Sequence, residues 1–221
     1  MKSFLTIFAV QMEKSFDMKV QKEPILREAF LLFKSKGVVP VKMDDIASRM
    51  SMSKRTLYEI FKNKENLILE CVIAHQKWNV TLFETESNSE QNVLRQAFEF
   101  LHLVMMDYNN TSHRFFEDLK KYPKVQAYID CVRAEGAVNG KKWLEKGVEQ
   151  GLFREDVRMD LVVSSVNIIS QSLSSRKESG GYSVKTLLNS IIMVILRGIV
   201  TSKGLLVLSM LEKKYFTNEE I

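Results

Sequence analysis

Apolar residues recur at three- and four-residue spacing along most of this chain, and this helical period is the feature that most constrains its fold. The pattern is clear from Ile25 to Phe33 and stops at Gly37, a residue type that commonly follows the last turn of a helix. No segment shows convincing β alternation, and three prolines in 221 residues leave few obligatory breaks. The sequence therefore predicts an all-α protein.

Two short helices are expected directly after the first one. Asp44 and Asp45 open the second helix, because acidic side chains suit the positive N-terminal end of the helix dipole. Ser51–Ser53 forms a turn, and the hydroxyl of Ser53 is a good N-cap for a third helix over Lys54–Phe61. This third helix is short and basic.

The rest of the chain reads as longer helices. Asn63 caps a fourth helix that begins at Lys64 and is expected to carry Trp78 toward a core. The helices expected beyond it are Gln91–Tyr108, Ser112–Lys121, Pro123–Glu149, Asp160–Arg176 and Val184–Leu211.

These elements predict two structural units behind an N-terminal extension. Residues 1–18 form the extension, which lacks the cleavage site of a secretory signal and contains Met12 and Met18 as alternative starts. Residues 19–66 form a three-helix head in which the two short helices and the turn between them make a helix-turn-helix, and residues 67–221 form a larger helical body.

The positive charge of the chain is concentrated in the head. Residues 19–66 hold eleven lysines and arginines against six acidic residues, an excess that equals the net charge of +5 of the whole chain. A local positive field suits a polyanion such as DNA, because phosphate neutralisation releases condensed counterions. The alternative is a lysine-rich face that is merely solvated.

A helix-turn-helix needs two helices locked at a fixed angle, so that the second presents its first residues to the major groove. Ala47 is the small residue that permits close approach, and the packed face consists of Ile46, Met50, Leu57 and Phe61. Lys54, Arg55 and Thr56 then face outward. Lysine and arginine can bond guanine or phosphate there, and threonine can contact phosphate or the methyl group of thymine.

Four segments resemble, in order and spacing, the head of the TetR-type (AcrR-like) regulators: Ile25–Phe30, Asp45–Ala47, Met52–Tyr58 and Phe61–Leu67. The resemblance implies that Tyr58 and Lys64 touch DNA phosphates. Where the family often has threonine this chain has Val41, so Lys42 is expected to replace that contact. Where the family commonly has glycine, this chain has Arg55, which is expected to alter the bases that are read. The candidate DNA contacts are Lys42, Ser53, Lys54, Arg55, Thr56, Tyr58 and Lys64.

The body resembles this family more weakly, through Phe115–Leu119 with Tyr122–Pro123 and through Glu149–Val157. The resemblance implies a homodimer through the last two long helices and release from an operator by a small molecule in the body. An apolar set in the last helix suits a dimer interface, although a helix buried within one subunit is the alternative: Ile191, Ile192, Val194, Ile195 and Ile199.

Candidates for an apolar effector pocket are Phe98, His102, Met105, Phe115, Phe116, Tyr128 and Trp143, although such a stripe is also typical of an ordinary core. The ligand-binding residues are left unassigned.

Several other functions lack support in the sequence. The chain has no catalytic constellation, no histidine pair at metal spacing and no glycine-rich phosphate loop, so no metal, cofactor or enzymatic activity is expected. Cys71 and Cys131 fit free thiols in a reducing, cytoplasmic compartment. The apolar stretch Leu187–Val200 is interrupted by Asn189 and Arg197, which favours an interface helix over a membrane span. The remaining rivals are a helical small-molecule-binding or interaction protein without specific operator binding, and an all-helical enzyme.

Overall fold

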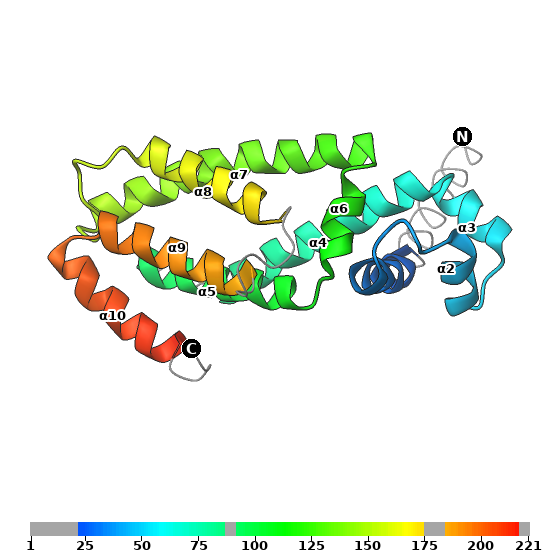
Figure 1. Ribbon diagram of the computed structural model, residues 1–221, viewed down its shortest axis with the longest axis horizontal. Helices are drawn as coiled ribbons and strands as arrows, with labels where there is room; N and C mark the ends of the chain where they lie inside the picture. Colours follow the sequence, from blue (N-terminus) through cyan, green and yellow to red (C-terminus); the bar gives the residue numbers. More distant parts are fainter. Residues whose placement is uncertain (1–21, 87–91, 175–183, 217–221) are drawn as a thin grey trace, which may run out of the picture.

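The computed structural model describes residues 22–86, 92–174 and 184–216, and all regular elements among them are helices (Figure 1). A helix over residues 22–36 precedes nine labelled ones. These are α2 (Met43–Arg49), α3 (Lys54–Phe61), α4 (Lys64–Glu86), α5 (Val93–Asn109), α6 (His113–Leu119), α7 (Pro123–Glu149), α8 (Met159–Ser174), α9 (Val184–Ile199) and α10 (Ser202–Phe216). The all-α prediction is confirmed, and the extension 1–18 lies outside the described residues.

The molecule is elongated, with a small head at one end and a body of longer helices at the other (Figure 1). The helix over residues 22–36, α2 and α3 form the head, and α4 runs from the head into the body (Figure 1). Gly37 ends the first helix as expected, with a φ of +87° that favours glycine.

The prediction of one helix over Val184–Leu211 is wrong, because the chain breaks between α9 and α10 at Val200–Thr201. The segment that follows α7 pairs with this break. The Arg154 N–H donates to the Ile199 carbonyl at 2.8 Å, and the Thr201 N–H donates to the Leu152 carbonyl at 2.9 Å. These bonds replace the helical ones that an unbroken helix would make.

Two hydrophobic cores hold the molecule together. The first joins the head to the start of α4 and to α6, since Phe115 and Leu119 are buried against head residues such as Phe33 and Phe61. The second lies in the body, around α5, α7 and α9, and includes Phe98 and Phe153. The head therefore shares its core with α4, with α6 and, through the buried Val125, with α7, rather than packing alone.

The expectation that Trp78 points into a core is wrong, because its side chain is 62% exposed. The apolar period of α4 is satisfied at the head end by Leu67, Ile68 and Cys71, which are all buried. The period therefore identified the helix correctly but did not identify the buried face at Trp78.

An ion-pair cluster joins the head to the body. The ammonium group of Lys34, on the helix over residues 22–36, pairs with the Asp107 carboxylate on α5, and His75 Nε2 on α4 lies 2.9 Å from the same carboxylate. Burial alone would raise the pKa of Asp107, but hydrogen bonds from His75 and Lys34 hold that pKa below its ordinary value. The carboxylate is therefore stabilised in its charged form.

We expect Asp107→Asn to lower the free energy of unfolding by about 1 kcal/mol at pH 7, a discounted figure because the carboxylate is partly exposed. The folded pKa of Asp107 is depressed, so its contribution is complete above the unfolded pKa and is lost as pH falls through the folded pKa. Urea unfolding at pH 7 and pH 3 should show the difference between wild type and variant shrinking in acid. The control is Asp130→Asn, which removes an exposed pair with Arg133. A difference that grows in acid would contradict the assignment.

Candidate nucleic-acid interface

The helix-turn-helix forms as the sequence predicts. The Met52 N–H donates to the Ala47 carbonyl at 2.9 Å and closes the turn, in which Ser51 has a φ of +51°. The Thr56 N–H donates to Ser53 Oγ at 3.0 Å, so the predicted N-cap of α3 is confirmed. These bonds fix where α3 begins and which side chains its first turn presents.

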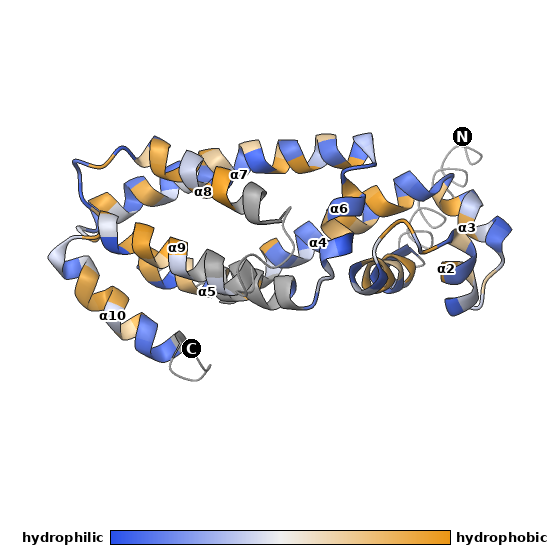
Figure 2. Ribbon diagram, viewed as in Figure 1, coloured by the Kyte–Doolittle hydropathy of each residue, from blue (hydrophilic) through white to orange (hydrophobic). Residues whose placement is uncertain are grey.

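Burial separates the packed face of α3 from its free face. Leu57 and Phe61 are 0% and 1% exposed, and they pack on Ile46 and Ala47 of α2. The opposite face is polar, and the first turn of α3 is hydrophilic in Figure 2. The geometry leaves one side of α3 free for a ligand outside the protein.

Six of the seven candidate DNA contacts are exposed. Five lie on α3 or at its N-cap, namely Ser53, Lys54, Arg55, Thr56 and Tyr58, and Lys42 is the residue that precedes α2. Among the ion-paired basic residues that the structure describes, Arg55 is the most exposed, with 89% of its side chain accessible to solvent. Tyr58 is 40% exposed, one turn further along α3. The Thr56 hydroxyl lies 2.8 Å from Ser53 Oγ, so these two hydroxyls bond to one another in this structure.

The two basic residues at the start of α3 each have an acidic partner. The Lys54 ammonium lies 2.9 Å from the carboxylate of Asp44 on α2, and this hydrogen bond raises the pKa of Lys54. Arg55 Nε donates to Glu59 Oε1 at 2.9 Å. Sequence reasoning missed both partners. The i,i+4 spacing of Arg55 and Glu59 signals their pairing, whereas the contact of Lys54 with Asp44 depends on the helix-turn-helix angle.

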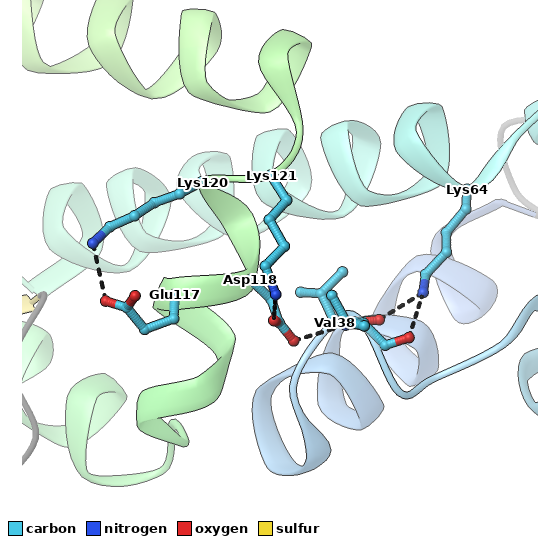
Figure 3. Close-up of polar contacts among 7 residues, drawn as sticks. Val38, Lys64, Glu117, Asp118, Lys120 and Lys121 are labelled. Carbon is cyan, nitrogen blue, oxygen red and sulfur yellow. Dashed lines mark hydrogen bonds and ion pairs between the residues drawn. The ribbon is translucent and has the colours of Figure 1, made fainter.

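The ammonium group of Lys64 is engaged within the protein rather than free at the surface. Its ammonium donates to the carbonyls of Val38 and Val39 at 2.6 and 3.2 Å (Figure 3). Burial lowers the pKa of Lys64, and the carboxylates of Asp118 and Asp45 partly oppose this effect. The contact of Lys64 with a phosphate stays a prediction, while its observed role is to hold the turn after the first helix.

The same turn is held from the other side by α6. The Val39 N–H donates to Asp118 Oδ2 at 2.7 Å, and the Lys121 ammonium lies 2.9 Å from Oδ1 (Figure 3). Gly37 lies directly against α6, since a Cβ atom there would be 2.5 Å from Arg114 Cγ. The head is thus clamped between Lys64 of α4 and Asp118 of α6.

The residues considered for an effector pocket do not converge on one core. Phe115 is buried in the first core and Phe116 packs on it, whereas Phe98 is buried in the second core and Trp143 packs there. The side chains of His102 and Met105 lie outside the described residues. Tyr128 is half-buried on α7. No pocket position is assigned from these residues.

The described residues support neither a metal site nor a membrane-spanning helix. They contain no cluster of three or more His, Cys, Asp or Glu side chains that could hold a metal ion. None of their helices combines the length and the apolar character that a bilayer crossing requires. Cys71 and Cys131 are free thiols, and burial raises the pKa of Cys71.

Comparison with known proteins gives consistent matches. The family model described as bacterial regulatory proteins, tetR family, matches residues 25–71. The HTH-type transcriptional repressor KstR2 of Mycolicibacterium smegmatis is 23% identical over 193 residues, which cover 83% of this chain and 93% of that protein. The matched family segment contains α2, α3 and Lys64, and so contains every candidate DNA contact.

Two solved structures share the fold over most of their length. A transcriptional regulator from Saccharomonospora viridis, in complex with choline, has a TM-score of 0.70 at 19% identity, covering 83% of this chain and 99% of that one. The TetR family regulator PfmR from Thermus thermophilus has a TM-score of 0.57 at 25% identity, covering 78% and 97%.

Proposed function

We propose that this chain is a TetR-type transcriptional regulator that represses transcription by binding operator DNA as a homodimer through α3. A small molecule bound in the body releases it from the operator. The observation that carries the proposal is the free face of α3, where a capped helix start presents basic side chains outward. No catalytic step belongs to this function.

Charge and exposure support the choice of DNA as the ligand. The whole positive excess of the chain lies in residues 19–66, and the exposed side chains of α3 include donors for phosphate and for base edges. In this proposal Lys42 and Tyr58 contact phosphates, and Arg55 reads a base. Lys64 contacts a phosphate only if it leaves the carbonyls of Val38 and Val39.

Exposed apolar side chains on α8 and α9 support a homodimer. Leu161 and Ile168 of α8 are 56% and 64% exposed, and Val194 of α9 is 72% exposed. The two helices pack against each other, and a two-fold interface would bury their outer faces twice. Ile199 is buried within its own subunit, so it does not belong to this surface.

The decisive experiment measures binding of the purified chain to its own upstream DNA at two salt concentrations, with random DNA as competitor. We expect binding tighter than about 1 μM that weakens with salt, with a slope set by several phosphate contacts. Equal affinity for upstream and random DNA would contradict operator binding. That result would favour the rival, a helical ligand-binding or interaction protein.

A second measurement separates base reading from phosphate contact. We expect Arg55→Ala to cost about 1 to 2 kcal/mol of binding free energy, because one base preference is lost. Tyr58→Phe removes only a phosphate contact and should weaken binding to all sequences alike. Competition with operator variants changed at single positions distinguishes the two. The reverse pattern would refute both roles.

A further inference from the structure

Glu59 is an acidic residue on the face of α3 that the proposed function turns toward DNA. It lies one helical turn after Arg55, and its Oε1 accepts a hydrogen bond from Arg55 Nε at 2.9 Å. Both side chains are largely exposed, at 89% for Arg55 and 62% for Glu59. An exposed i,i+4 pair contributes little to folding stability. Loss of this contact is therefore expected to leave α3 folded.

The contact with Glu59 uses Nε of Arg55 and leaves the two terminal nitrogens of its guanidinium group available. A guanidinium group has five N–H donors, and only the one on Nε is used by Glu59. The two terminal nitrogens are the pair that bonds the O6 and N7 acceptors of guanine. A carboxylate on Nε restricts the rotation of the planar group, so less freedom is lost when that pair of bonds forms.

The charge of Glu59 has a second consequence. A carboxylate brought against DNA is repelled by phosphates and is desolvated, which weakens every complex to some extent. The penalty is offset where Arg55 binds guanine and remains paired with Glu59. It is not offset on a sequence that offers Arg55 no such partner, so the acid weakens the wrong complexes most.

We propose that Glu59 is a specificity-determining residue, which positions the Arg55 guanidinium for guanine and disfavours DNA that lacks guanine at that position. This inference rests on the proposed function, because it assumes that α3 lies in the major groove. Arg55 is the group that contacts the base, and Glu59 acts through it.

The experiment is selection of duplexes from a random-sequence pool by the wild-type chain and by variants, followed by competition against unselected pool DNA. The variants are Glu59→Ala, Glu59→Gln and Arg55→Ala. The control is Glu145→Ala, which removes the acid of another exposed i,i+4 pair, with Lys141 on α7, and makes the same change in net charge. Alanine suits a helix interior, so these substitutions are compatible with α3 and α7.

Wild type should select guanine at one position in each half-site, and Arg55→Ala should lose that preference. Glu59→Ala should reduce the same preference about tenfold, leave the other positions unchanged, and bind pool DNA about threefold more tightly. Glu59→Gln keeps an acceptor for Nε but not the charge, so it should retain more of the preference while also binding pool DNA more tightly. Glu145→Ala should match wild type.

The failures are distinguishable. A wild-type chain that enriches no sequence overturns the proposed function, and this inference with it. A wild-type site that Glu59→Ala leaves unchanged overturns the inference alone. A preference that responds to Glu59→Ala but not to Arg55→Ala also overturns it, because Glu59 would then read the base directly.

Discussion

Gly147→Ala is expected to lower the free energy of unfolding by about 3 kcal/mol, although alanine is the better helix former. Gly147 lies in α7 where the helix packs on the second core. A Cβ atom at this position would be 2.1 Å from Phe153 Cδ2 and 2.9 Å from Val93 Cγ2. Both neighbours are buried, with exposed fractions of 1% and 0%, so neither side chain can move aside without opening the core.

The matched control is Gly136→Ala in the same helix. Gly136 is exposed, and a Cβ atom there would meet no atom within 4 Å. Its substitution should raise the free energy of unfolding by about 0.5 to 1 kcal/mol, because only the backbone entropy of the unfolded chain changes. Urea unfolding followed by circular dichroism measures both. If both substitutions shift the urea midpoint in the same direction, packing against Phe153 is not the reason that position 147 needs glycine.

The features that the sequence predicted well are those that a few neighbouring residues determine. The N-cap of α3 needs only Ser53 and the N–H of Thr56, and the cap of α4 needs only Asn63 and the N–H of Asn66. Each is complete within four residues, so residue type and spacing suffice to identify it. The exposed basic start of α3 could be predicted in the same way, from the Ser53 cap and from the apolar residues that α3 buries.

The features that were missed depend on segments far apart in the chain. Nothing near Lys64 indicates that its ammonium binds the carbonyls of Val38 and Val39, some 25 residues earlier. The break before α10 likewise depends on hydrogen bonds between Thr201 and Leu152, which the apolar run around Val200 does not reveal. A helical period describes one segment at a time, whereas these contacts depend on tertiary packing.

Asp118→Ala is expected to lower the free energy of unfolding strongly, because Asp118 holds the head on α6. The Asp118 carboxylate is buried and accepts the Val39 N–H at 2.7 Å, and Lys121 pairs with its other oxygen at 2.9 Å. Burial alone would raise the pKa of Asp118, but the hydrogen bonds of Val39 and Lys121 hold it below its ordinary value. Removing the acceptor leaves a partly buried N–H unsatisfied, so we expect the free energy of unfolding to fall by about 2 to 3 kcal/mol.

The matched control for Asp118 lies beside it in α6. Glu117 pairs with Lys120 at 2.9 Å with the same i,i+3 spacing, but this pair is exposed and points away from the turn at Val38 (Figure 3). Glu117→Ala should therefore leave the unfolding midpoint nearly unchanged. Asp118→Asn should fall between wild type and Asp118→Ala, because an amide oxygen can still accept the Val39 N–H without the charge that attracts Lys121. Equal losses for Asp118→Ala and Glu117→Ala in thermal unfolding would show that the bond to Val39 does not hold the head on α6.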